Sequence, residues 1–290
     1  MYKIITKGKL LIILTLLLLV SFTGTSLYMV YAYTVSEEET TEIKLPIVMY
    51  HSILKSRRNE YIVSPTELEK DLKYLQQNNF NTITAEDLIN YIYSDIALPE
   101  KPVMITFDDG YLNNLTYAVP LLEQYNMRAV ISVVGSFTDE ESSAERHASY
   151  SYLNWNEINE IINSDTIEIQ CHTYNLHKNS GDRKGAGKTR SESAEEYGKF
   201  LREDILKFKQ VMEINTAYQT KAFIYPFGVY SEESEAIIKN MGFLASFSCR
   251  EKLNIISKNP ESLYLLGRFN RSGNISSENF FKKLLKNYEE

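Results

Sequence analysis

Two adjacent carboxylates, Asp108 and Asp109, directly follow the apolar run 102–107. Neighbouring carboxylates that leave a buried strand are energetically costly unless a positive charge lies beside them. The pair therefore indicates a metal ion or a basic side chain at this position. A purely structural interpretation is also open, because Asp109-Gly110 is a common turn sequence.

Two of the four histidines of the chain, His172 and His177, follow a second apolar run, 166–171. A loop that leaves a strand can turn both imidazoles toward one ion. Together with one of the two aspartates they form the ligand set of a catalytic zinc, or of a similar divalent site with open positions. The other aspartate could then act as a base on water. We expect a divalent cation, Zn²⁺ foremost, with Co²⁺, Ni²⁺ or Mn²⁺ as alternatives.

The chain from residue 45 onward alternates short apolar runs with amphipathic ones. Strands are expected at 45–50, 80–83, 102–107, 129–134, 166–171, 222–225, 243–247 and 263–269. Helices are expected to begin at Pro65, after Thr84 and after Asn154, and near 115–125, 195–213, 234–240 and 280–285. About seven such units indicate an α/β fold whose parallel sheet closes into a barrel. Both polar clusters would then meet at the carboxyl ends of the strands, with the insertions 136–151 and 178–193 as mobile surface loops.

The amino terminus has the pattern of a membrane segment. Three lysines precede the uncharged stretch 10–35, and three glutamates follow it. This stretch is long enough to cross a bilayer core of about 30 Å. Its flanking charges predict that the amino terminus lies in the cytoplasm and the rest of the chain outside the cell. We expect an uncleaved anchor at 1–36, a short stalk at 37–44 and the functional domain at 45–290. The alternative is a cleaved signal peptide and a secreted protein.

Composition excludes several classes of protein. The formal net charge of −7 argues against nonspecific binding to nucleic acid, which needs a basic surface. Two cysteines cannot build a disulfide framework or a zinc site made mainly of thiolates. A single bridge between Cys171 and Cys249 remains conceivable outside the cell. The domain is expected to be a monomer.

Four segments of the sequence resemble the motifs of one family. They are Thr106-Phe-Asp-Asp-Gly110, His172-Thr-x-x-x-His177, Tyr225-Pro-Phe-Gly228 and, upstream, Met49-Tyr50-His51-Ser52. They occur in the order seen in polysaccharide deacetylases, the carbohydrate esterases with a NodB-homology domain. The resemblance covers roughly residues 45 to 275. The first two motifs together are highly specific for the family, whereas the Pro-Phe-Gly motif alone would be weak evidence for it.

The resemblance implies a distorted (β/α)₇ barrel and the metal-dependent removal of N-acetyl groups from amino-sugar polymers. Carried over by position, Asp108 is the general base, and Asp109, His172 and His177 bind the metal. The five-residue spacing of the histidines is similar to that of the branch acting on poly-N-acetylglucosamine. Peptidoglycan and chitooligosaccharides are alternative substrates. An inactive glycan-binding module at the cell surface is the alternative from another class, although binding alone does not need a base beside a metal.

The sequence departs from the family pattern at two places. No histidine follows His177, so the usual carboxyl-terminal catalytic histidine is missing. His51 ends the first strand and is our candidate for the general acid; alternatively, it orients an aspartate. Phe223 stands where the family has an arginine, and Arg268 could supply the cation that keeps Asp108 ionised. His147 lies in a polar insertion and is expected to be a solvated loop residue.

Residues near the expected strand ends are candidates for sugar contacts. Aromatic rings can stack on sugar faces, and most residues of the set belong to or adjoin the motifs, while Arg268 lies at a late strand end. The set is Tyr111, Tyr174, Tyr225, Pro226, Phe227, Gly228 and Arg268. Core packing is an equal possibility for Phe227.

Overall fold

The computed structural model of the chain describes residues 20–26, 42–56, 58–141 and 146–289. It divides into two units, 1–41 and 42–290. In the first unit residues 20–26 are helical. Most of the predicted anchor and stalk lies outside the described residues, so both stay predictions. Within the described part of the chain, no helix has the length and apolar character needed to cross a membrane.

The second unit is built around a parallel sheet, which comprises eight strands among the described residues. The strands are β2 (Ile47–Tyr50), β5 (Asn81–Ile83), β6 (Pro102–Phe107), β7 (Ala129–Val133), β8 (Ile167–Cys171), β11 (Ala222–Ile224), β12 (Ala245–Phe247) and β14 (Phe269–Asn270). Their order is β12-β11-β8-β7-β6-β2-β14, with β5 beside β6. Every pairing is parallel, as the alternation of strands and helices predicted.

The sheet curls because one segment contacts both of its ends. β14 pairs with β2, and the preceding Leu266 forms a parallel bridge with Phe247 of β12. The predicted strand 263–269 is therefore only partly correct. The segment begins with the short helix η3 (Pro260–Leu263), and Leu265 adopts a left-handed backbone (φ 53°) that interrupts an extended run. The curled parallel sheet is consistent with the predicted barrel.

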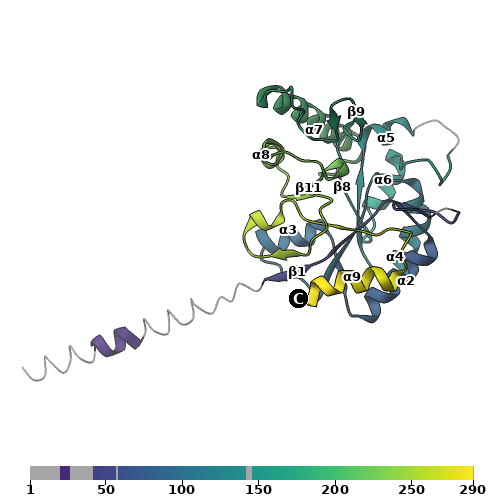
Figure 1. The fold of residues 1–290 in the computed structure, drawn as a ribbon. Helices are drawn as coiled ribbons and strands as arrows, with labels where there is room; N and C mark the ends of the chain where they lie inside the picture. Colours follow the sequence, from purple (N-terminus) through teal and green to yellow (C-terminus); the bar gives the residue numbers. More distant parts are fainter. Residues whose placement is uncertain (1–19, 27–41, 57, 142–145, 290) are drawn as a thin grey trace, which may run out of the picture. The chain divides into compact units, whose positions relative to one another are not determined.

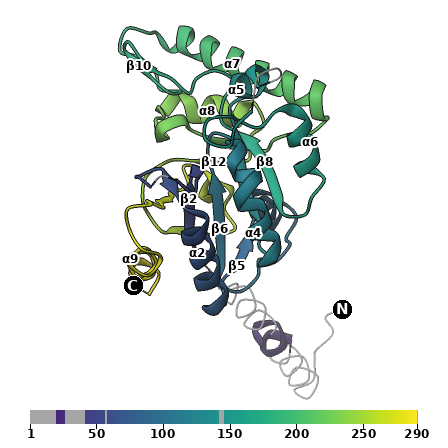
Figure 2. The same cartoon turned by 90° about the vertical axis from the view of Figure 1, so that its right-hand side faces the viewer.

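Helices cover the outside of the sheet (Figures 1 and 2). They are α2 (Pro65–Gln77), α3 (Ala85–Tyr93), α4 (Val119–Gln124) after the π-helical turn η1 (Asn114–Ala118), α6 (Trp155–Ile162), α7 (Ala194–Thr216), α8 (Glu232–Asn240) and α9 (Ser277–Glu289). The predicted caps Ser64, Thr84 and Asn154 each accept a backbone N–H of the first turn. These local signals place the helix starts where the sequence predicted them.

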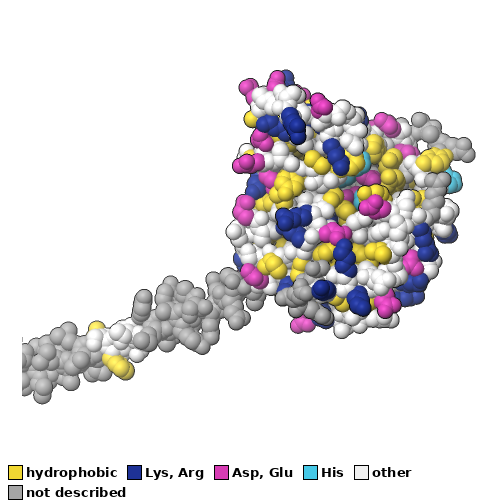
Figure 3. Space-filling model, in the orientation of Figure 1, with side chains coloured by type: hydrophobic (Ala, Val, Ile, Leu, Met, Phe, Trp, Pro, Cys, Tyr) yellow, Lys and Arg dark blue, Asp and Glu magenta, His cyan; other side chains and the backbone are white. Residues whose placement is uncertain are grey.

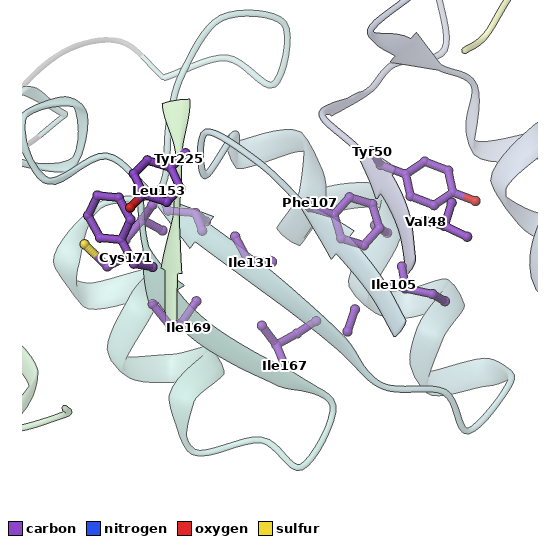
Figure 4. Packing of buried hydrophobic residues seen from close by; sticks show 14 of the residues in the cluster. Val48, Tyr50, Ile105, Phe107, Ile131, Leu153, Ile167, Ile169, Cys171 and Tyr225 are labelled. Atoms are coloured by element: carbon purple, nitrogen blue, oxygen red, sulfur yellow. The ribbon is translucent and has the colours of Figure 1, made fainter. Parts of the chain in front are cut away.

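The sheet is apolar on both faces. Val48, Ile105, Ile131 and Ile169 on neighbouring strands are fully buried and belong to the larger hydrophobic cluster shown in Figure 4. The residues that alternate with them, among them Ile47, Met104 and Val130, belong to a second cluster. A parallel sheet covered on both sides requires such continuous apolar strands, and this makes them recognisable in the sequence.

Both predicted loop insertions contain regular structure. The first includes helix α5 (Gly135–Glu140), and the second includes a hairpin of β9 (Asn179–Ser180) and β10 (Arg183–Lys184). Ala186 after the hairpin is fully buried, and its carbonyl accepts a hydrogen bond from the Tyr197 hydroxyl. The described parts of both insertions thus contain more regular structure than their polar composition predicted, and residues 142–145 of the first lie outside the described residues.

Two other short pairings were not anticipated. β1 (Ile43–Leu45) pairs antiparallel with β13 (Asn254–Ile256), and β3 (Ser52–Ile53) pairs parallel with β4 (Ile62–Val63).

The two cysteines are free, so the conceivable bridge between Cys171 and Cys249 does not form. Cys171 is buried in β8, as a small apolar residue would be.

Candidate active site

The predicted metal ligands come together at the carboxyl ends of β6 and β8. His177 Nε2 lies 3.0 Å from Asp109 Oδ1, and His172 Nε2 lies 3.5 Å from the same oxygen. One potential ligand atom from each of the three residues lies within 4.8 Å of the others. The fold thus brings together side chains that are more than sixty positions apart in the sequence.

The hydrogen bonding of this triad fits a cation. The Ile224 carbonyl accepts a hydrogen bond from His172 Nδ1 at 2.9 Å, which leaves the lone pair on Nε2 facing the Asp109 carboxylate. Asp109 Oδ1 is buried and, among the described residues, has no hydrogen-bond partner. An electron-rich nitrogen and an unsatisfied carboxylate oxygen that face each other need a positive charge between them. The donor set suits a divalent transition metal.

The charges of the triad support the same interpretation. Burial raises the pKa of Asp109, but the two imidazoles and His51 outweigh it, so the pKa lies far below the usual range. Burial lowers the pKa of His177, but the neighbouring Asp109 more than compensates and the net shift is upward. The site thus favours a carboxylate opposite positive charge, which is the electrostatic environment a bound cation would complete.

Asp108 is held by Arg268 in a bidentate ion pair. Arg268 Nη1 donates to Asp108 Oδ1 at 2.6 Å, and Nη2 donates to Oδ2 at 2.8 Å. Burial raises the pKa of Asp108, but Arg268 and nearby histidines lower it to about 2, so the carboxyl is ionised at neutral pH. The predicted partnership is therefore present. The prediction that Arg268 contacts substrate was wrong, since its side chain is fully buried.

His51 reaches the same site from the end of β2. Its ring lies 5.0 Å from that of Tyr61 in an edge-on contact, and its Nδ1 is buried with no partner among the described residues. Burial lowers its pKa, against the opposing attraction of Asp108 and Asp109. His147 is exposed, as expected, and its Nδ1 accepts the Ser149 N–H.

A cleft of about 650 Å³ opens over these groups. Figure 3 shows histidine side chains in a hollow among hydrophobic and acidic side chains. The residues that line the cleft include seven that the sequence singled out, namely His51, Asp108, Asp109, Tyr111, His172, His177 and Phe227. They also include Tyr61, Lys184, Cys249, Glu251 and Asn270. The last five were not predicted. No motif marks them, and they reach the cleft only through the folding of their loops.

The predicted sugar contacts divide into two groups. Phe227 is 37% exposed and packs 4.5 Å from the His177 ring, and Tyr111 lines the cleft while stacking on Tyr152. Tyr225 and Pro226 are buried, and the Tyr225 hydroxyl donates to Glu235, so the prediction that they contact sugar was wrong. Both follow directly after β11, and Tyr225 packs in the main hydrophobic cluster.

Two further candidates do not line the cleft. Tyr174 faces a separate hollow behind the histidine loop, and its hydroxyl donates to Asp139. Gly228 has a structural role, since its φ is +66° and a Cβ there would lie 2.5 Å from the backbone nitrogen of Cys249.

The loop between the two histidines is held from behind by helix α7. Asp204 accepts the backbone N–H groups of Tyr174 and Asn175, both at 2.8 Å. Burial nevertheless raises the pKa of Asp204 to about 6, although these two hydrogen bonds and Lys178 lower it. No motif or spacing in the sequence indicates this contact.

The raised pKa of Asp204 predicts a pH dependence of stability. A folded-state pKa of about 6 against the usual 3.8 means that the protonated group stabilises the fold below pH 3.8, and that this contribution is lost as the pH rises through 6. The free energy of unfolding of the wild type, relative to Asp204→Asn, should fall by about 3 kcal/mol between pH 3.5 and 7. Urea unfolding of the metal-free proteins across this range measures it. A difference independent of pH would contradict the prediction.

Comparisons with known proteins agree with the site. The sequence pattern of the polysaccharide deacetylase family matches residues 95–246, which include the aspartate pair and both histidines. Bacillus subtilis YxkH, named for this family, is 30% identical over 200 residues, covering 69% of this chain and 62% of its own length. The chain thus spans less than two thirds of that relative.

Two further proteins show the same likeness. A poly-β-1,6-N-acetyl-D-glucosamine N-deacetylase of Staphylococcus aureus is 23% identical over 218 residues, covering 75% of this chain and 70% of its own. A de-N-acetylase structure from Aggregatibacter actinomycetemcomitans superposes with a TM-score of 0.70 at 22% identity, covering 82% of this chain and all of that one. The structural match concerns the fold. Because the family pattern covers half of the sequence and includes the clustered ligands, the chain belongs to the polysaccharide deacetylase family.

Proposed function

We propose that this protein is a metal-dependent hydrolase that removes N-acetyl groups from an amino-sugar polysaccharide at the cell surface. The observation that carries the proposal is the unsatisfied Asp109 Oδ1 facing two imidazoles, directly beside an ionised Asp108 in an open cleft. A glycan-binding module would need neither the base nor the ligands.

The chain's own groups divide the chemistry between them. Asp109, His172 and His177 would hold a divalent cation, Zn²⁺ foremost, which when bound would polarise a water molecule and the acetamide carbonyl. Asp108 accepts the proton of the attacking water. Arg268 keeps Asp108 ionised and fixes both of its oxygens. His51 delivers a proton to the departing nitrogen, so that acetate and a free amine leave.

A poly-N-acetylglucosamine-like polymer is the favoured substrate. The support is the five-residue histidine spacing together with the likeness to a deacetylase named for this polymer. Phe227 and Tyr111 offer ring faces beside the ligands, and the cleft is open to solvent. The uncharged stretch 10–35 supports an anchored or secreted enzyme, since the substrate lies outside the cell.

The test is acetate release from poly-N-acetylglucosamine, peptidoglycan and chitooligosaccharides, before and after treatment with a chelator. We expect release to be fastest from the first polymer, to stop on chelation, and to return when Zn²⁺, Co²⁺, Ni²⁺ or Mn²⁺ is added back. Turnover that is insensitive to chelation would contradict the metal-dependent mechanism. Metal binding without acetate release from any substrate would favour the glycan-binding module instead.

A further inference from the structure

The loop that carries His177 depends on contacts outside the metal site. His172 is fixed by its place at the end of β8 and by the hydrogen bond between Nδ1 and the Ile224 carbonyl. His177 Nε2 lies 3.0 Å from Asp109 Oδ1, inside the metal site, and outside it the ring packs against Phe227 and Phe137. The position from which His177 enters the site therefore depends on the backbone of the four residues that separate it from His172.

That backbone is tightly bent. Thr173 has a left-handed conformation (φ 72°), and its hydroxyl oxygen accepts the Leu176 N–H at 3.1 Å. A β-branched residue adopts this conformation only where surrounding contacts enforce it. The N–H groups of Gly135 and Ser136 bind the carbonyls of Thr173 and Tyr174 from one side. The N–H groups of Tyr174 and Asn175 point the other way, toward α7.

Asp204 satisfies both of these N–H groups with its two carboxylate oxygens. It is carried by a rigid helix, because Leu201, Ile205 and Phe208 on either side of it are fully buried in the main hydrophobic cluster. The carboxylate itself faces a hollow of about 580 Å³ that is separate from the catalytic cleft. Asp204 thus has no contact with the catalytic groups, yet it holds the centre of the loop between two of them.

We infer that Asp204 is a positioning residue for the metal site: by clamping the Tyr174 and Asn175 amides it fixes the loop that presents His177. The inference rests on the proposed function, in that Asp109, His172 and His177 bind a divalent cation. The residues that orient a metal ligand affect metal affinity by about 10- to 100-fold, although they never touch the ion.

The experiment measures Co²⁺ binding to the full chain by visible absorption. Asp204→Ala removes both acceptors, Asp204→Asn keeps one acceptor oxygen, and Glu203→Ala is the matched control. Glu203 is the neighbouring acid on α7; it lines the same hollow but is 64% exposed, and among the described residues it pairs only with Lys199. We expect the dissociation constant for Co²⁺ to rise at least about tenfold in Asp204→Ala, to rise less in Asp204→Asn, and to stay unchanged in Glu203→Ala. The absorption bands of bound Co²⁺ should change with the first two.

Thermal unfolding of the metal-free variants separates positioning from stability. Wild-type affinity and an unchanged Co²⁺ spectrum in folded Asp204 variants would overturn the inference, even if their melting temperatures fall. If Asp204→Ala does not fold, Asp204→Asn decides by the same criterion. Failure of the wild type to bind Co²⁺ would contradict the proposed metal centre itself, and is therefore distinguishable from failure of this inference alone.

Discussion

Asp108→Asn is expected to abolish acetate release while leaving the bound metal in place. Asparagine keeps the shape of the side chain but cannot accept a proton from water, so we expect turnover to fall by about 10²- to 10⁴-fold. Asp109, His172 and His177 are untouched, and their ligand atoms still lie within 4.8 Å of one another. Metal content after dialysis and thermal unfolding, measured beside acetate release, check this result, because the variant also leaves the buried Arg268 charge without its partner.

His177→Ala is expected to lose turnover as well, but to differ from Asp108→Asn in its metal content. It removes one of three protein ligands, so the protein should lose its metal on dialysis and its turnover with it. His147→Ala is the matched control, because His147 is an exposed histidine outside the cleft. Normal metal content in His177→Ala, or substantial turnover in Asp108→Asn, would contradict the assignment of roles to these residues.

The second large effect concerns the stability of the fold and a buried ion pair that does not line the catalytic cleft. Arg271 and Asp71 are both fully buried, with Nε–Oδ2 and Nη2–Oδ1 distances of 2.7 and 3.0 Å. The Tyr50 hydroxyl donates to the same carboxylate, and so does Ser277 at the start of α9. This one carboxylate thus links α2, the end of β2 and the carboxyl-terminal helix.

Asp71→Asn should destabilise the protein by about 3–5 kcal/mol, because it leaves the buried Arg271 charge with only the longer contact to Glu67, at 3.6 Å. For a chain of this size we expect the melting temperature to fall by about 10 °C. Replacing both partners, as in Asp71→Leu with Arg271→Met, should restore most of the loss, since the uncompensated charge is then gone. Calorimetry or urea unfolding measures each variant.

Glu69→Gln is the control for this network. Glu69 lies on the same helix and pairs with Lys73 at 2.8 Å, but the two side chains are 32% and 50% exposed, so we expect a much smaller change than in Asp71→Asn. A loss in Asp71→Asn no larger than that of the control would show that the buried pair does not support the fold.

The sequence was sufficient to predict the elements and the chemical groups. Apolar strands such as 102–107, helix caps such as Ser64 and the five-residue spacing of His172 and His177 are local features that survive in the structure. They do so because hydrophobic periodicity and capping depend on neighbouring residues, and because metal chemistry selects few residue types. The candidate ligand types and a second carboxylate that could act as base followed from these features, whereas the assignment of Asp109 as ligand and Asp108 as base came from the resemblance to the family.

The direction in which side chains point could not be predicted in the same way. Tyr225 was expected in the cleft but lies in the core, because its direction depends on the curl of the sheet. Arg268 was expected to reach substrate as well as Asp108, and only its complete burial excludes the first role. Tyr61 enters the cleft through a loop that carries no motif.

The sequence alone determined that this chain holds a parallel α/β domain with two imidazoles and two carboxylates at strand ends. Only the tertiary structure decided which other groups are partners, namely Asp71 with Arg271 and Asp204 with the histidine loop. The physical reason is that these pairs join segments far apart in the chain, and their stability depends on burial created by the packing of the whole domain. Such contacts leave no periodicity or spacing in the sequence from which they could be read.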